Sequence, residues 1–215
     1  APTERSMMKR LFVGAILAAM NTTAICAEPG APERVTEAFI STLIAQARAR
    51  YGIPALAVAV MNTQTIRVCS VQGFRVHDRP DVVTPDDYFH IGSCSKSVLA
   101  LMAARLVAQK QISWDTRFFD LFPDLKDAAQ PVYSEITLEQ LFLCRAGIRA
   151  YTDPSTDTLP QIEGAAPSAR LKFIEYLVAQ PPASRITQGE FDHLYSNASY
   201  TMASAMIERA AGSTY

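Results

Sequence analysis

The chain has 215 residues, of which 49% are hydrophobic and 19% charged, and its formal net charge is -1. These values are typical of a compact globular domain and exclude a fibrous or intrinsically disordered chain. The near-neutral balance, without a block of Lys and Arg, gives no electrostatic footprint for nucleic acid. We therefore expect one globular domain without a nucleic-acid partner.

Residues 1–27 have the order of a secretory signal. Lys9 and Arg10 precede an apolar run over residues 11–20, and a small-residue stretch ends at Ala27. Export signals have a basic, an apolar and a small-residue part in this order. The apolar run is too short for a stable membrane span, which takes about 20 residues. We expect a secreted or periplasmic protein whose mature domain covers residues 28–215.

Two alternatives stay open for this segment. The apolar run could be a buried helix of the mature fold, and Cys26 could be lipidated, although Ile25 occupies a position where lipidation signals usually have a small residue. Removal of the signal would leave Cys69, Cys94 and Cys144. We interpret these three as small buried hydrophobic residues, and the sequence leaves open whether Cys69 and Cys144 pair.

Metal and cofactor chemistry finds little support in the sequence. The histidines His77, His90 and His193 lack the spacing of metal ligands, and no Cys-x-x-Cys pair suggests redox work. We expect neither a metal nor a cofactor.

The first predicted elements are a helix and a β-hairpin. Apolar residues recur at helical spacing over residues 33–50, and a turn at residues 51–54 ends the pattern. Residues 55–61 and 65–71 are short runs with a turn between them, which is typical of a hairpin. A two-stranded ribbon is marginally stable by itself. We interpret it as the beginning of an antiparallel sheet of which only this hairpin is visible.

The remainder is predicted to be mostly helical. The expected elements are a long helix opening at Gly92 and Ser93, a short helix over residues 137–143 entered by Ser134 with Glu135 and Thr137 as cap candidates, a loop over residues 151–167, a helix from Ser168 to Gln180 and a last helix over residues 197–211 ended by Gly212. The predicted fold class is mixed α/β (α+β), a helical subdomain with an incomplete antiparallel sheet.

Ser93 and Lys96 are the first candidates for chemistry. Their spacing places a hydroxyl and an amine on one face of a helix, within reach of each other. A serine hydroxyl becomes a good nucleophile only when a neighbouring group takes its proton. The helix N-terminus adds positive potential, and the Ser93 N–H could stabilise an oxyanion.

The Ser-x-x-Lys pattern alone is weak. Ser6 and Lys9 match it equally well, although they lie in the upstream and signal residues 1–27, outside the predicted mature domain. Ser93 could simply cap its helix while Lys96 is a solvated side chain. Tyr195, considered alone, could be an ordinary core or rim aromatic residue.

A wider set of residues resembles the serine β-lactamase-like family, which includes class C β-lactamases, D-alanyl-D-alanine peptidases and related esterases. The resemblance begins at residues 88–97, Tyr-Phe-His-Ile-Gly-Ser-Cys-Ser-Lys-Ser, and continues at residues 112–116 and 121–123. Residues 195–197, Tyr-Ser-Asn, resemble the Tyr-x-Asn motif of the family and precede a similar helix. The similarity covers roughly residues 53–215.

This resemblance implies a role for each site residue. Ser93 would form an acyl-enzyme, Lys96 would relay its proton, and Tyr195 would share acid and base duty beside Lys96. Asn197 would hydrogen-bond Lys96 and the amide of the substrate. The implied function is an exported serine hydrolase acting on amide or ester acyl groups of a small molecule or peptide, with an oligomeric state that the sequence leaves open.

The sequence departs from the family pattern in two places. The family carries a third motif, Lys or His, any residue, then Gly, on a later strand, and the sequence ends at Tyr215 without it. We therefore expect a fragment or truncated product that lacks the C-terminal strands of the domain. Where the family has His-Thr-Ser-Gly, residues 144–147 are Cys-Arg-Ala-Gly. Arg145 could face a substrate carboxylate, but we favour a solvated surface position.

Four functional alternatives stay open. The implied enzyme could be a β-lactamase, a cell-wall D-alanyl-D-alanine peptidase or an esterase, because the missing region contains much of what separates them. The absence of the third motif also allows a catalytically silent binding module. The reaction of the chain with a fluorescent penicillin would discriminate between these alternatives.

Overall fold

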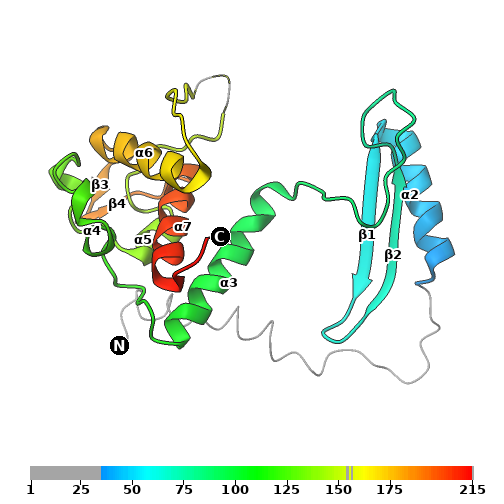
Figure 1. Ribbon diagram of the computed structural model, residues 1–215, viewed down its shortest axis with the longest axis horizontal. Helices are drawn as coiled ribbons and strands as arrows, with labels where there is room; N and C mark the ends of the chain where they lie inside the picture. The colour runs from blue at the N-terminus through cyan, green and yellow to red at the C-terminus, as the bar shows by residue number, and fades with distance from the viewer. Residues whose placement is uncertain (1–34, 154, 156, 215) are drawn as a thin grey trace. The chain divides into compact units, whose positions relative to one another are not determined.

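The chain divides into two compact units, and the boundary in the sequence falls between Ile91 and Gly92. The computed structural model describes residues 35–153, 155 and 157–214 (Figure 1). The predicted signal over residues 1–27 lies outside the described residues. Each unit is described by itself below.

The first unit packs one helix against a β-hairpin. Helix α2 spans Glu37–Tyr51, and strands β1, Ala55–Met61, and β2, Ile66–Gly73, pair antiparallel (Figure 1). The predicted helix and hairpin are therefore present. Alternate residues of the strands face α2, and the core they form consists of Ile40, Ile44 and Val68 with Leu56, Val58 and Val60 packed against it.

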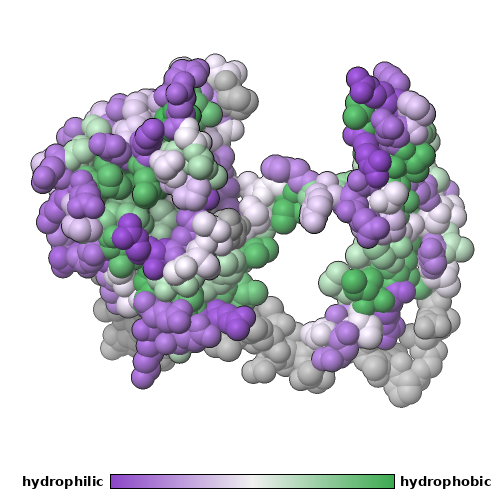
Figure 2. Space-filling view, viewed as in Figure 1, coloured by the Kyte–Doolittle hydropathy of each residue, from purple (hydrophilic) through white to green (hydrophobic). Residues whose placement is uncertain are grey.

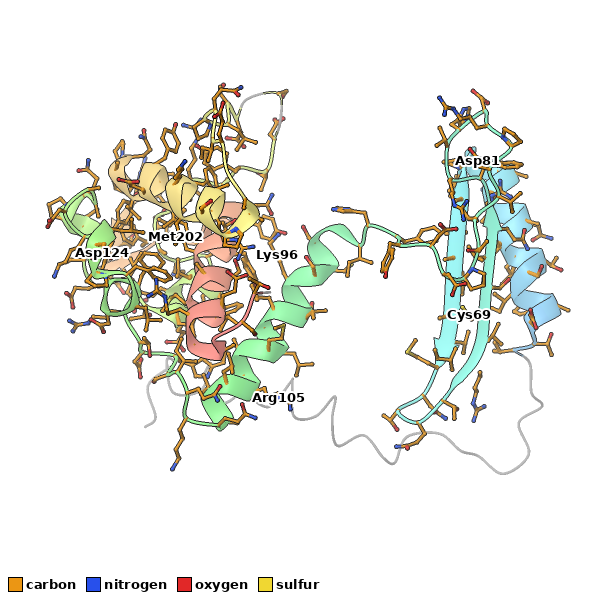
Figure 3. The ribbon with its side chains drawn as sticks, viewed as in Figure 1. Cys69, Asp81, Lys96, Arg105, Asp124 and Met202 are labelled. Carbon is orange, nitrogen blue, oxygen red and sulfur yellow. The ribbon has the colours of Figure 1, made fainter. Side chains whose placement is uncertain are left out.

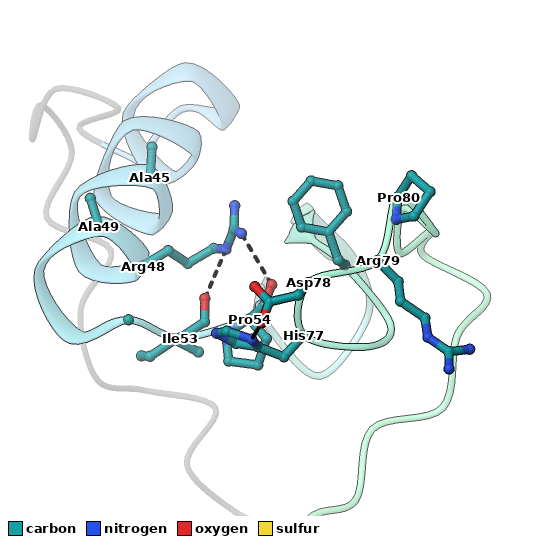
Figure 4. Close-up of a pocket in the computed structure, with 11 residues that line it drawn as sticks. Ala45, Arg48, Ala49, Ile53, Pro54, His77, Asp78, Arg79 and Pro80 are labelled. Carbon is teal, nitrogen blue, oxygen red and sulfur yellow. Dashed lines mark hydrogen bonds and ion pairs between the residues drawn. The ribbon is translucent and has the colours of Figure 1, made fainter.

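Arg48 joins the end of α2 to the start of the hairpin. Its Nε donates to the Ile53 carbonyl at 3.2 Å and its Nη2 to the Pro54 carbonyl at 3.1 Å (Figure 4). Gly73 is required beside it, because its φ is +120° and a Cβ there would lie 2.0 Å from the Pro54 oxygen. A groove of about 700 Å³ opens next to Arg48 and is walled by Phe74.

The second unit is built around helix α7, Asn197–Ala211. The other elements are η1, Gly92–Cys94; α3, Ser95–Ala108; α4, Phe118–Leu121; η2, Pro123–Leu125; η3, Pro131–Tyr133; α5, Leu138–Phe142; α6, Ala166–Ala179; β3, Ile186–Thr187; and β4, Glu190–Phe191. Helices α3, α4, α5 and α6 all contact α7. Because it is surrounded, α7 buries small and sulfur-containing residues such as Ala203 and Met202 completely.

Helix α3 buries only one of its apolar sides. Leu99, Ala103 and Leu106 are buried, whereas Val98, Leu101 and Met102 are exposed. The visible hydrophobic surface over α3 in Figure 2 agrees with this exposure. In the described part of the chain, no helix has the length and apolar character needed to cross a membrane.

The structure confirms the mixed fold class but differs from the prediction in two helical details. Helix α6 begins at Ala166 rather than at Ser168, with Pro167 in its first turn. Proline suits that position because its missing N–H would have no partner there. Ser93 lies in the 3₁₀ turn η1 immediately before α3 rather than in the first turn of the α-helix.

A second, very short ribbon was not predicted. Strands β3 and β4 pair antiparallel through Gln188 and Gly189, which have φ values of 55° and 84°. Two consecutive residues of positive φ are typical of a two-residue hairpin turn. Each strand has only two residues, which is too short for an alternation of apolar and polar residues to be recognised in the sequence.

The cysteines are only partly as predicted. Cys144 is buried, as expected, whereas Cys69 and Cys94 are exposed, so the prediction of buried hydrophobic residues is wrong for these two. Cys69 lies on the face of β2 that points away from α2, and Cys94 ends the open turn η1. All three are free thiols, which excludes a disulfide between Cys69 and Cys144 in this structure.

Candidate active site

The turn before α3 presents the candidate nucleophile. Gly92 has a φ of 53°, and the Ser95 hydroxyl donates to the Gly92 carbonyl at 2.8 Å, which closes the turn. Ser93 is left exposed on this turn. Lys96 follows in the first turn of α3, near α7 (Figure 3), and its Nζ donates to Ser93 Oγ at 3.2 Å.

The start of α7 is fixed by Ser196. Its buried Oγ accepts from the Ser199 N–H at 2.9 Å as a helix cap and donates to the Arg149 carbonyl at 2.7 Å. The adjacent Asn197 N–H donates to the Ala150 carbonyl at 2.8 Å. These bonds hold the residues on both sides of Ser196 in place. Tyr195, two residues before the first residue of α7, is exposed, whereas Asn197 is half-buried.

The structure brings all four predicted site residues together. The Tyr195 hydroxyl donates to Ser93 Oγ at 2.9 Å, and Lys96 Nζ donates to Asn197 Oδ1 at 2.6 Å. The Asn197 amide in turn donates from Nδ2 to the Tyr151 carbonyl at 2.7 Å, which fixes its orientation. A hydroxyl, an amine and a phenol thus share one small site within the second unit.

The electrostatics of the site favour the deprotonated form of Tyr195. Hydrogen bonds with Ser93 and then with Lys96 are the largest effects, and they lower the pKa of the Tyr195 phenol below its usual value. Desolvation opposes them, and the positive charge of Lys96 adds a smaller lowering. The Lys96 ammonium also lies 4.9 Å from the centre of the Tyr195 ring. A phenol with a lowered pKa is a better proton acceptor near neutral pH than an ordinary tyrosine.

Cys144 is buried, and its thiol is close enough to Lys96 for the lysine charge to act on it. Burial raises the pKa of its thiol, although the Ser196 N–H and the charge of Lys96 act in the opposite direction. The raised pKa favours the protonated thiol, which is a poor nucleophile. The Cys144 carbonyl accepts from the Leu194 N–H at 2.9 Å, which ties this position to the segment that carries Tyr195.

Residues 144–147, Cys-Arg-Ala-Gly, align with the His-Thr-Ser-Gly element noted above, so Arg145 differs from that element and Gly147 is retained. Arg145 is half-buried, with its Nη1 3.5 Å from the Phe191 carbonyl, rather than a fully solvated surface side chain. Gly147 has a φ of +71°, and a Cβ there would lie 2.6 Å from the Phe191 ring. Only glycine fits this position without displacing that ring.

Two supporting residues escaped the sequence prediction. Ser196 was noted only as the middle of Tyr-Ser-Asn, yet a serine immediately before a helical pattern is a recognisable cap signal. Tyr151 supplies a backbone carbonyl to Asn197 and has a φ of 48°. A contact through a backbone carbonyl leaves no side-chain pattern in the sequence, so only the folded structure reveals the role of Tyr151.

Within the described residues, 35–153, 155 and 157–214, no group of three or more His, Cys, Asp or Glu side chains could hold a metal ion. The site itself presents a hydroxyl, an amine, a phenol and an amide. These groups suit nucleophilic attack on a carbonyl carbon.

The fold is that of proteins with a β-lactamase fold. The Beta-lactamase family model matches residues 40–215. The chain therefore belongs to the beta-lactamase family, whose members are serine hydrolases.

Solved structures share the fold at low sequence identity. A penicillin-binding protein homologue from Caulobacter crescentus has a TM-score of 0.62 and 22% identity over 89% of this chain and 47% of its own. A class C β-lactamase from Rhodobacter sphaeroides has a TM-score of 0.57 and 21% identity over 81% of this chain and 44% of its own. The D-alanine carboxypeptidase AmpC from Burkholderia cenocepacia has a TM-score of 0.57 and 22% identity over 81% of this chain and 43% of its own. This chain thus spans less than half the length of these structures.

Proposed function

We propose that the chain belongs to a serine hydrolase that cleaves amide or ester acyl groups through a covalent acyl-enzyme on Ser93. The observation that carries the proposal is the contact of Ser93 Oγ with both the Tyr195 hydroxyl, at 2.9 Å, and Lys96 Nζ, at 3.2 Å. A nucleophile within hydrogen-bond reach of its base is the geometric requirement for this chemistry.

The proposed reaction has two halves. In the first, Ser93 Oγ attacks the carbonyl carbon and its proton passes to the Tyr195 and Lys96 pair. The Ser93 N–H stabilises the oxyanion, the acyl bond to the amine or alcohol breaks, and the pair returns the proton to that leaving group. In the second half, water gives a proton to the same pair and attacks the ester carbonyl. The proton then returns to Ser93 as the acid is released.

Asn197 is proposed to orient Lys96 and to contact the substrate. Its Oδ1 accepts from Lys96 at 2.6 Å while its Nδ2 is held by the Tyr151 carbonyl at 2.7 Å. A side chain held at both ends keeps the lysine in one position at little entropic cost. The proposed substrates are a β-lactam, a cell-wall peptide or an ester, all of which present an acyl carbon to Ser93.

Incubation with a fluorescent penicillin tests the proposal. We expect the fluorophore to attach covalently to the folded chain and Ser93→Ala to abolish the attachment. Ser95→Ala is the matched control, because it removes the next hydroxyl of the same turn and leaves Ser93 in place. A lasting adduct would favour peptidase-like chemistry, and a transient adduct with turnover would favour a β-lactamase. A folded chain that neither forms an adduct nor hydrolyses esters would support the silent binding module instead.

We also propose export to a secreted or periplasmic location. The support is the order of basic, apolar and small residues over residues 1–27. N-terminal sequencing of the protein from the periplasmic and cytoplasmic fractions of an expressing bacterium checks it. We expect a periplasmic form that begins near residue 28, and an uncleaved cytoplasmic chain would refute the proposal.

A further inference from the structure

Tyr200 is a second aromatic neighbour of Lys96. It lies on α7, one turn after Asn197, and its ring centre is 5.3 Å from Lys96 Nζ. The Tyr195 ring centre is 4.9 Å from the same nitrogen. Both distances fall within the roughly 6 Å over which an ammonium is attracted to an aromatic face. The amine is therefore in contact with two rings as well as with the Ser93 and Asn197 oxygens.

The hydroxyl of Tyr200 is occupied elsewhere. It donates to the Phe142 carbonyl at 3.2 Å, and the ring packs edge-on against the Phe142 ring with centroids 5.3 Å apart. Burial raises the pKa of the Tyr200 phenol to about 12, so this hydroxyl stays protonated. Tyr200 thus presents only its ring to Lys96, while its hydroxyl anchors that ring to α5.

We propose that Tyr200 is a positioning residue, whose anchored ring face holds the Lys96 ammonium against Ser93 and Tyr195. A catalytic role for Tyr200 rests on the function proposed above, whereas its effect on the position of Lys96 does not. The expected consequence is local, because the Tyr200 ring faces Lys96, its hydroxyl bonds to α5, and its further electrostatic neighbours are Tyr195 and Cys144. Tyr200 acts on the nucleophile only through the lysine.

Tyr195 reports the position of Lys96. The titratable groups facing the ammonium are Tyr195 and Tyr200, from the start of α7, and Cys144, which follows α5. Lys96 lowers the pKa of Tyr195 both by a hydrogen bond and by its charge. If Lys96 loses the Tyr200 ring and moves, this lowering weakens and the pKa of Tyr195 rises.

The test is an NMR titration of the chain labelled with ¹³C at the tyrosine Cζ, with the Tyr195 signal assigned from Tyr195→Phe. We expect Tyr200→Leu to raise the Tyr195 midpoint by about half a pH unit. Tyr200→Phe should raise it by less, because it loses only the hydroxyl bond to Phe142 and keeps the ring face and its packing on the Phe142 ring. Tyr200→Met provides a second ring-free variant, and only variants whose circular dichroism matches the parent chain are titrated.

The Lys96→Ala background separates a lysine effect from a general one. There Tyr200→Leu should cause no further rise, since no ammonium remains to be held. The proposal is overturned if Tyr200→Leu and Tyr200→Met leave the midpoint unchanged, if Tyr200→Phe raises it as much, or if the rise persists without Lys96. The titration requires no turnover. A chain that fails to react with penicillin but shows these shifts refutes the proposed function and supports this inference.

Discussion

The Tyr195 phenol has two partners at the site, and both favour its deprotonated form. Ser93 and Lys96 hydrogen-bond to it, and Lys96 adds a positive charge beside it. Since the pKa of Tyr195 is lowered, its deprotonated fraction at neutral pH is larger than that of an ordinary tyrosine. An acylation step that needs this base speeds up as the pH rises toward the lowered pKa and levels off above it.

Removing the amine should shift that dependence. In Lys96→Ala the pKa of Tyr195 returns toward its usual value, so the rise of the acylation rate moves to higher pH. We expect the rate at pH 7 to fall by about 10²–10⁴-fold, the usual contribution of acid–base catalysis. The measurement is the stopped-flow rate of penicillin acylation between pH 5 and 10.

Lys172→Ala is the matched control for this lysine. Lys172 lies on α6, where its Nζ donates to the Glu163 carbonyl at 3.0 Å rather than to any residue of the site. Its removal should leave the pH profile in place. An unchanged profile in Lys96→Ala would mean that the amine does not tune Tyr195.

At the scale of elements, the cap of α7 matters most to the site. Ser196 accepts from the first turn of α7 and donates to the Arg149 carbonyl, and it is 1% exposed. Both of its neighbours in sequence, Tyr195 and Asn197, belong to the site. One buried hydroxyl therefore sets the start of the helix and the geometry of two functional side chains.

Ser196→Ala should lower both stability and reactivity. The lost cap costs about 1 kcal/mol of unfolding free energy, and the unpaired Arg149 carbonyl adds to that cost. Urea unfolding followed by tryptophan fluorescence measures it, since Trp114 lies in the same unit and packs edge-on against Phe142. Thr36→Ala is the comparison, because Thr36 caps α2 of the first unit. An equal and negligible effect of both variants on this transition would refute the assigned role of Ser196.

The elements were predicted unequally well, for physical reasons. The hairpin and α7 show clear periodicity with turn or glycine ends, and both are found within two residues of their predicted bounds. The ribbon of β3 and β4 and the single turn of α4 are too short for any period to appear. The start of α6 was misplaced because Pro167 was interpreted as a loop residue.

The site was predictable only in part. Helical spacing alone brings Ser93 and Lys96 together, because they are three residues apart. Tyr195 and Asn197 follow about a hundred residues later, and only the resemblance to a family placed them beside Lys96. Tyr200 has no such signal, since an aromatic residue at helical spacing looks like any core residue.

At the scale of the whole molecule, the four predicted site residues all lie in the second unit. They come from η1, α3 and the start of α7, all after Gly92. The family match covers residues 40–215 and so includes most of both units. The first unit has a small core of its own, built from α2 and one face of the hairpin. The described contacts among the four site residues therefore do not involve the first unit.

The central claim is that Ser93, and no neighbouring group, is the nucleophile. Its most direct test is tandem mass spectrometry of the acid-quenched chain after brief exposure to penicillin, with the acyl group located by peptide fragmentation. We predict one acyl group, on Ser93, with Cys94 and Ser95 in the same turn unmodified. An acyl group on either of those residues, or none on a chain shown to be folded, would contradict the account.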